Sequence, residues 1–271
     1  TLDGTLFPYT TLFRSPLHVE QFIRFLHEEG GEPPSGLADL LIQRIDLLGA
    51  SARRALQALA VLGDESAPDA VAALLNSEDD VAFALGTLQS RGMVVVEDKL
   101  LSAAHPLIRE LVAASTPAAV RRELHARAVT APTRHPMPLE ARALHSYQAE
   151  DAFQALLLLE QVAERVLNRG DTSSEILSLR RGLEMARREI ARGELDDPLR
   201  AMLIFGRKLG AALTRAGNFA DAEGVLREAL DVAGPRSVER ARVLGALAHV
   251  AHGRRRHGEA LDYIERAVDA A

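Results

Sequence analysis

Residues 78–127, EDDVAFALGTLQSRGMVVVEDKLLSAAHPLIRELVAASTPAAVRRELHAR, decide how this chain folds. Apolar residues recur first at the spacing of a helix, and then gather in two short runs, Met93–Glu97 and Leu100–Ala103. Apolar, β-branched runs on either side of a two-residue turn are typical of a β-hairpin. Helical spacing returns after His105. The stretch therefore predicts a helix, a two-stranded wing and two further helices.

More helices are expected before this stretch. Gly36–Gly63 carries two apolar stripes that are split at Gly49, and Asp69–Leu75 predicts a short third helix. Ser51 and Ser77 are the expected N-caps of two of the helices, because a serine hydroxyl accepts hydrogen bonds from free amides of the first turn.

The order of helices and hairpin predicts a winged-helix domain with trailing helices over residues 36–130. A winged helix that reads DNA needs Lys or Arg at the start of its recognition helix. Here that helix begins with Glu78, Asp79 and Asp80, whose charges repel phosphates. The chain also has a formal net charge of -6. We therefore expect no direct DNA binding by this chain, and an internal coupling role for this domain.

Composition predicts a folded, mostly α-helical protein. Hydrophobic residues make up 47% of the 271 positions, which is enough for a sizeable core. Aromatic residues are only 4% and there is no Trp, so the core must pack Ala and Leu, which are strong helix formers. The absence of Cys excludes disulfides and thiolate metal sites. No apolar run approaches the ~20 residues of a membrane span, and we expect a cytoplasmic location with no membrane contact.

The first fifteen residues differ from the rest. Residues 1–15 hold Phe7, Tyr9 and Phe13 in a chain that is otherwise poor in aromatics, and they offer no periodic face. We interpret them as a non-native leader. A helix that starts at Pro16 is expected next, within a segment that spans residues 16–35.

A second domain is expected after a linker. Residues 131–139 are rich in proline and mark the best domain boundary. From residue 140 to residue 271 one amphipathic pattern follows another, which predicts a series of helical hairpins.

An internal repeat supports this prediction. The pattern Ala222, Leu226 and Ala229 recurs 38 residues later, and a small residue stands twelve positions before each copy. Small residues at such positions let two antiparallel helices approach closely, while the bulky one fills the notch between repeats. The residues predicted to pack the repeats are Gly210, Ala222, Leu226, Ala229, Ala248, Ala260, Ile264 and Ala267.

Stacked hairpins build an extended binding face from the first helix of each hairpin, here Leu199–Arg215 and Val238–His252. The polar positions of these helices are candidates to line a partner groove, and they suit an acidic peptide or a domain of the same protein. A solvated face with no partner is the alternative interpretation of these positions. The candidate residues are Arg207, Lys208, Arg242 and His249.

Two motifs resemble a known family. Ser15-Pro-Leu-His-Val-Glu20 resembles the end of the Gly-Asn-Pro-Leu-x-x-Glu motif of STAND ATPases, signal-transduction relatives of the AAA+ proteins, although Arg14 and Ser15 replace its Gly and Asn. Leu88-Gln-Ser-Arg-Gly-Met-Val followed by His105-Pro-Leu-Ile-Arg-Glu is similar to the family's L-x-x-R-G-hydrophobic and H-x-L-hydrophobic-R-E pattern. The repeat spacing resembles the tetratricopeptide repeat, whose period is ~34.

The resemblance implies a regulatory fragment of a bacterial signal-transduction ATPase. Residues 16–35 are then the end of the ATPase module, with Pro16 near the adenine, and residues 140–271 are tetratricopeptide-like repeats that bind a protein, a peptide or an inducer. ATP or ADP and Mg would be held by the parent module, and no cofactor or metal by this chain. The repeat region is especially similar to those of serine/threonine kinase–ATPase fusions. A maltose-regulator-type transcription activator and a free-standing tetratricopeptide adaptor are the alternatives.

No catalytic constellation is present in the sequence, so this chain is not expected to be an enzyme. There is no G-x-x-x-x-G-K-[ST] phosphate loop, no G-x-S-x-G and no H-E-x-x-H. His249 and His252 have the spacing of one metal edge, but no carboxylate stands at matching spacing.

We predict that the chain neither binds nor hydrolyses ATP, because it has no phosphate-cradling loop. Calorimetric titration of the chain with ATP and Mg should give no heat of binding. Micromolar binding would contradict this prediction.

Overall fold

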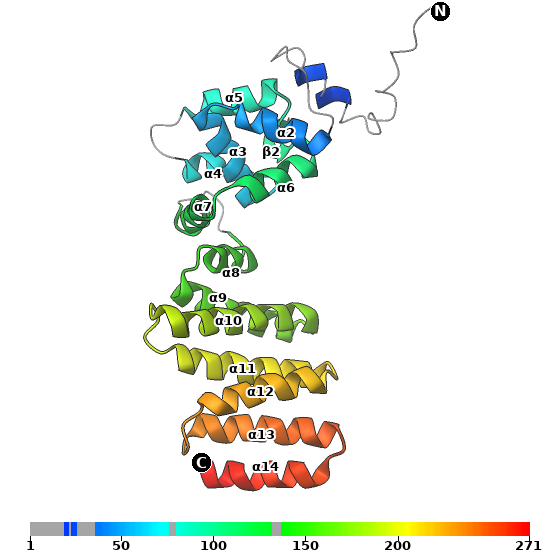
Figure 1. Cartoon of the computed structure of the whole chain (residues 1–271), viewed down its shortest axis with the longest axis vertical. Coiled ribbons are helices and arrows are strands. Elements are labelled where there is room, and N and C mark those ends of the chain that lie inside the picture. The colour runs from blue at the N-terminus through cyan, green and yellow to red at the C-terminus, as the bar shows by residue number, and fades with distance from the viewer. Residues whose placement is uncertain (1–18, 22, 26–35, 76–79, 132–136) are drawn as a thin grey trace, which may run out of the picture. The chain divides into compact units, whose positions relative to one another are not determined.

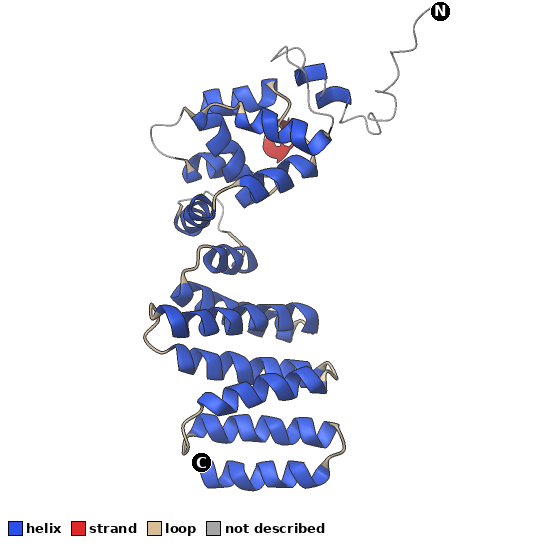
Figure 2. Cartoon of the chain, in the orientation of Figure 1, coloured by secondary structure: helices blue, strands red, loops and turns tan. Residues whose placement is uncertain are grey.

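The computed structural model describes residues 19–21, 23–25, 36–75, 80–131 and 137–271. These residues are mostly helical, with one small two-stranded sheet (Figure 1; Figure 2), so the predicted mostly α fold class is confirmed. The chain divides into two compact units, one before and one after the segment 132–136. None of the helices in the described ranges is long and apolar enough to cross a lipid bilayer. The predicted leader and Pro16 lie outside the described residues.

The first unit combines α-helices with one β-hairpin. The elements are α2 (Leu37–Asp46), α3 (Ala50–Leu62), α4 (Pro68–Leu74), α5 (Val81–Ser90), β1 (Val94–Glu97), β2 (Leu100–Ala103), α6 (Pro106–Ser115) and α7 (Ala118–Thr130). Helix α3 lies at the centre, because α4, α5, α6 and α7 all contact it.

The tight turn of the hairpin holds two non-glycine residues in the left-handed region. Strands β1 and β2 pair in antiparallel register. The two turn residues, Asp98 and Lys99, have φ values of 49° and 68°, which is the backbone of a type I′ hairpin turn. A further bridge pairs Ser66 with Leu101, so the segment between α3 and α4 lies against the hairpin.

Two predicted helix caps are wrong. Helix α3 begins directly after Gly49, which leaves Ser51 inside the first turn. Helix α5 begins at Val81, and its cap is Asp80, whose carboxylate accepts a hydrogen bond from the Phe83 amide. The predicted cap Ser77 stands too early for that helix and lies outside the described residues. The Asp80 carboxylate also stabilises the positive end of the helix dipole.

A buried arginine joins the described part of the segment 16–35 to the end of α5. The side chain of Arg44 on α2 is 1% exposed. It donates hydrogen bonds to the Arg91 carbonyl at 2.7 Å and to the Gln21 side chain. Phe25 is also buried. The described residues of the segment 16–35 therefore pack onto this unit.

The second unit is a stack of antiparallel helices (Figure 1), each packed against the next. The elements are α8 (Leu139–Gln148), α9 (Ala152–Asn168), α10 (Thr172–Arg192), α11 (Pro198–Arg215), α12 (Phe219–Val232), α13 (Val238–Gly253) and α14 (His257–Ala270). Pairs α9–α10, α11–α12 and α13–α14 are the hairpins, and α9, α11 and α13 are called the first helices below.

The hairpin turns share one backbone conformation. Gly170 follows α9 with φ of 77°, Gly217 follows α11 with 76°, and Arg255 follows α13 with 61°. This left-handed region suits glycine because a Cβ is crowded there. Gly217 and Arg255 are 38 residues apart, so the turn repeats with the same offset as the apolar pattern.

Close approach between helices depends on small residues. A Cβ on Gly182 of α10 would lie 2.1 Å from the Phe205 ring of α11. A Cβ on Gly210 would lie 2.5 Å from Leu226 of α12. Both glycines therefore admit a bulky partner into the space that their own side chain would fill. Ala229 of α12 lies in the same way 3.1 Å from a Cβ position on Gly206.

We predict that Ala229→Leu destabilises the protein by roughly 1–3 kcal/mol, because the larger side chain overpacks the contact with α11. Ala229 is fully buried, and urea unfolding of the chain measures the change. Ala220→Leu, at an exposed position of the same helix, is the matched control and should cost little. Equal stability of the two variants would show that this contact tolerates additional volume.

Candidate functional site

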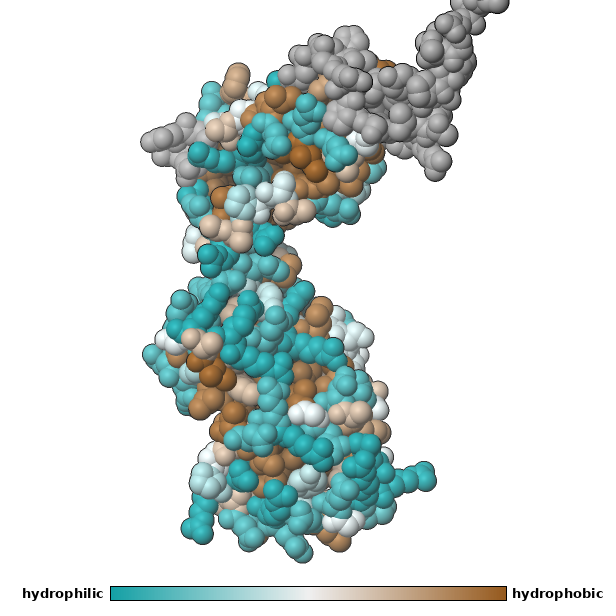
Figure 3. Space-filling model, viewed as in Figure 1, coloured by the Kyte–Doolittle hydropathy of each residue, from teal (hydrophilic) through white to brown (hydrophobic). Residues whose placement is uncertain are grey.

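The second unit presents two different sides. On one side the first helices α9 and α11 meet, because Lys208 of α11 reaches Glu160 and Glu164 of α9. On the other side α10 and α12 are linked by the ion pairs Arg180–Asp221 and Arg187–Glu228. The visible face of the stack alternates between apolar and hydrophilic surface (Figure 3). The side built from the first helices is the one on which the sequence places a partner groove.

Lys208 is held by two carboxylates of the preceding hairpin. Its Nζ donates hydrogen bonds to Glu160 at 2.6 Å and to Glu164 at 2.9 Å. Burial lowers the pKa of Lys208, but the two carboxylate hydrogen bonds outweigh that effect and leave its pKa raised. Lys208 is therefore a charged bridge between two first helices, and its charge is already compensated within the chain.

The other predicted groove residues lie on α11 and α13. Arg207 is half-buried on α11, and its Nε has no hydrogen-bond partner in the described part of the chain. Arg242 and His249 are exposed on α13, seven residues apart and hence on one helix face. Arg242 pairs with Glu239 of its own helix at 2.8 Å. The four residues do not form a cluster of free cations, since Lys208 and Arg242 are both paired.

A groove with an apolar floor lies between α9 and α11, and we call it the α9–α11 groove. Its volume is about 300 Å³. Phe153 is 65% exposed and Leu157, one helical turn later, is 44% exposed. Its lining residues are Phe153, Leu156, Leu157, Glu160, Leu195, Asp196, Asp197, Arg200, Ala201, Ile204 and Phe205.

The rim of this groove has more carboxylates than cations. Asp197 caps α11 by accepting a hydrogen bond from the Arg200 amide at 2.9 Å. Asp196 beside it is exposed and makes no ion pair with any described residue. Glu160 shares Lys208 with a second carboxylate. Arg200 is the cationic side chain of the lining.

Sequence reasoning missed the apolar part of this groove. Helix α9 reads AFQALLLLEQVAERVLN and has more apolar residues than one buried stripe can use. Leu156, Leu159 and Val166 fill the core stripe, whereas Phe153 and Leu157 fall outside it. An apolar i, i+4 pair beside the core stripe is the signal that could have indicated an exposed apolar surface.

A second, larger cavity lies between α10, α11 and α12, with a volume of about 570 Å³. Its apolar floor includes Leu183, Leu209 and Leu213, each only 2% exposed. The ion pairs that join α10 to α12 are formed by residues of its lining. Its large apolar lining residues are buried or half-buried, whereas the α9–α11 groove presents the exposed apolar side chains Phe153 and Leu157.

Most of the predicted packing residues are buried, whereas Ile264 in the last hairpin is exposed. Ala222, Leu226 and Ala229 are fully buried, and Ala248 and Ala260 are 6% and 7% exposed. Ala267 is half-buried, and Ile264, which matches Leu226 by sequence, is 49% exposed. Helix α14 packs chiefly on α13, so the side of α14 that carries Ile264 is open. The same open side carries Leu261 and Val268.

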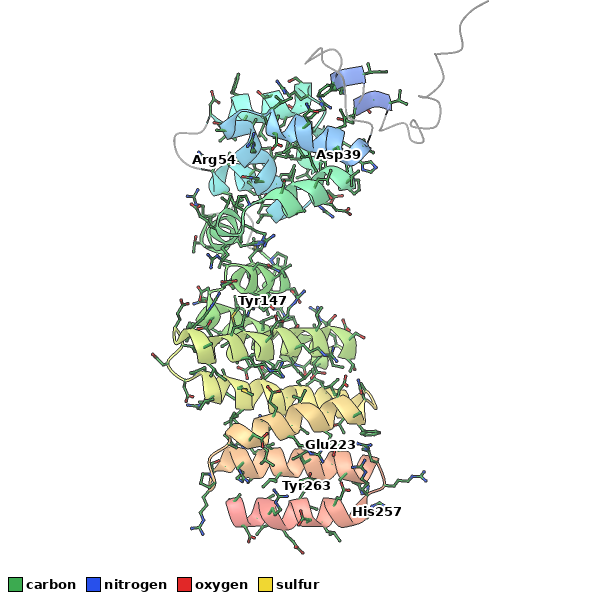
Figure 4. The ribbon with its side chains drawn as sticks, viewed as in Figure 1. Asp39, Arg54, Tyr147, Glu223, His257 and Tyr263 are labelled. Atoms are coloured by element: carbon green, nitrogen blue, oxygen red, sulfur yellow. The ribbon has the colours of Figure 1, made fainter. Side chains whose placement is uncertain are left out.

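The arginine run Arg254–Arg256, which lies between α13 and α14, forms ion pairs within the chain. Glu223 of α12 is 9% exposed. It pairs with Arg254, with Arg256 at 3.6 Å, and with Arg227 at 2.5 Å. Figure 4 shows Glu223 and His257 at the same end of the stack, near this turn. The run therefore fixes the last hairpin on α12.

The histidines near this turn do not form a metal site with neighbouring carboxylates. The rings of His252 and His257 lie 5.3 Å apart. Within the described residues, no group of three or more potential ligands could hold a metal ion.

Comparison with known proteins identifies the repeat. Residues 200–271 match the tetratricopeptide repeat family. No curated protein matches the chain. Among solved structures, the chain is similar to a STAND protein with a tetratricopeptide repeat sensor, PH0952 from Pyrococcus horikoshii, with 13% identity and a TM-score of 0.42. The similarity covers 97% of this chain and 50% of that one, so the chain spans half the length of that protein. The stack α9–α14 is a solenoid of tetratricopeptide-like hairpins.

A buried histidine in the second unit predicts a pH dependence of stability. Burial lowers the pKa of His145 on α8 below its usual value of 6.5. The unfolded chain therefore binds this proton more readily, so the free energy of unfolding should fall as the pH falls below about 6.5. His145→Gln should flatten this slope, which urea unfolding at several pH values measures. An unchanged slope in the variant would assign the pH dependence to other groups.

Proposed function

We propose that this chain is the regulatory and sensor part of a bacterial STAND-type signalling ATPase, and that its hairpin stack binds a protein partner. The observation that carries the proposal is the α9–α11 groove, an exposed apolar surface on the first helices of a tetratricopeptide-like stack. Helical repeats use the extended face of their stack for binding. Exposed apolar surface with a polar rim is typical of a protein-interaction site.

The first unit is proposed to be a winged helix that couples sensor and ATPase. The order α3, Ser66 bridge, α4, α5, β1 and β2 supports this assignment. The exposed positions of α5 are uncharged, and include Phe83, which is 71% exposed. A helix without Lys or Arg lacks the phosphate contacts that hold a recognition helix in the groove of DNA. The surface of α5 suits contact with protein better than contact with DNA.

The motif resemblance supports a proposal about the parent protein. The parent protein would bind ATP or ADP with Mg in a module that ends with residues 16–35, and a serine/threonine kinase–ATPase fusion is the favoured parent. In such a parent protein, the sensor transmits partner binding to the ATPase through the winged helix. The parent's reading frame distinguishes this from a transcription activator or a free-standing adaptor.

Site-specific photo-crosslinking tests the binding role. A photoreactive residue replaces Ile204 or Arg242 on the first helices of the full chain, in cells of its source, and replaces Ile190 as control. Ile190 is 48% exposed on α10. The first-helix positions should capture one discrete protein, and the control should not. Capture from the control alone, or from no position, would contradict the proposed function, and so would tight binding of duplex DNA at physiological salt.

A further inference from the structure

We propose that the α9–α11 groove reads a partner segment that places a bulky apolar side chain next to Lys or Arg. This inference rests on the proposed sensor function and assigns the chemistry of its ligand. It differs in sign from the sequence expectation of an acidic ligand, which treated Lys208 as a free cation.

Exposed apolar side chains in the groove indicate that the ligand has an apolar part. Phe153 and Leu157 are exposed on one face of α9, and half-buried Ile204 of α11 lines the same groove. Covering such side chains with a ligand is favourable, because it removes apolar surface from water. A cavity of about 300 Å³ has room for a large apolar side chain. Aromatic and aliphatic anchors that enter such pockets dominate the affinity of protein interfaces.

The charges around the apolar floor indicate that the ligand also has a basic part. Glu160, Glu164, Asp196 and Asp197 contribute four carboxylates, against the two cations Arg200 and Lys208. Lys208 is shared by Glu160 and Glu164, so each of these carboxylates keeps part of its hydrogen-bonding capacity. Asp196 is open to solvent and to a ligand. The local excess of negative charge attracts Lys or Arg and repels an acidic segment.

Other ligands fit less well. Nucleic acid would bring its phosphates against the carboxylate rim. A purely apolar small molecule would use the floor and leave the rim without a role. A protein segment with alternating apolar and basic residues satisfies both, because a bulky side chain can fill the floor while its neighbour reaches the rim.

Two labelled peptides with identical Leu and Phe positions provide the test. One peptide has Lys at its charged positions and the other has Glu, and fluorescence anisotropy measures their binding to the full chain. The Lys peptide should bind about tenfold more tightly than the Glu peptide. Its affinity should fall with added salt, because exposed charges are screened.

Variants of the chain test which sign of ligand charge the groove prefers. Lys208→Met removes a cation and should tighten binding of the Lys peptide, whereas a site for an acidic ligand would lose affinity for the Glu peptide. Asp196→Asn should weaken the Lys peptide severalfold. Phe153→Ser should weaken it about tenfold. Ile190→Ser removes an exposed apolar side chain elsewhere and should leave affinity unchanged. Circular dichroism confirms that each variant is folded.

The ligand chemistry and the proposed sensor function can fail independently of each other. Preference for the Glu peptide, weaker binding of the Lys peptide after Lys208→Met, or no binding of either peptide overturns the basic–apolar ligand. Loss of chain self-association in Phe153→Ser, seen by sedimentation, would assign the groove to a second copy and overturn it as well. Capture of a partner at Ile204 by crosslinking would still uphold the sensor function in each case. An acidic crosslinked segment would reverse only the sign proposed here.

Discussion

Close contact between helices at small residues is the constraint on which the hairpin stack depends. Phe205 and Leu226 occupy the space that a side chain on Gly182 and Gly210 would need. With little aromatic volume available, the core gains its packing density by bringing backbones together rather than by filling gaps with large side chains. The small residues therefore set the distance between helices, and the binding surface depends on that distance.

The polar contacts between hairpins explain why the two sides of the stack differ. On the side of α10 and α12, two ion pairs seven residues apart follow the helices and link them across the cavity that they line. On the side of α9 and α11, the inter-helix ion pairs converge on Lys208. Among the described residues, no ion pair joins the beginnings of α9 and α11. Phe153 and Leu157 are exposed in this open part.

Local sequence patterns predicted most of the fold, because most of these elements are decided by near neighbours. Helix positions follow from apolar periodicity, and the hairpin follows from two apolar runs around Asp98 and Lys99. The repeat offset was visible because Ala222 and Ala229 each face another helix. The caps were harder, since both Ser77 and Asp80 are good caps, and only the first residue of the helix decides between them.

The candidate groove could be predicted only in part, because it is made by residues far apart in the sequence. Lys208 and Glu160 are both charged and, taken alone, each suits a solvated face. Their hydrogen bond joins two hairpins and changes the role of both residues. The lysine is no longer available to an acidic ligand, and the glutamate belongs to the rim of an apolar groove. The sign of the charge that a partner meets therefore depends on the packing of neighbouring repeats. A stack of similar hairpins can change its ligand chemistry through a few such bridges while the packing contacts at Gly210 and Leu226 stay the same.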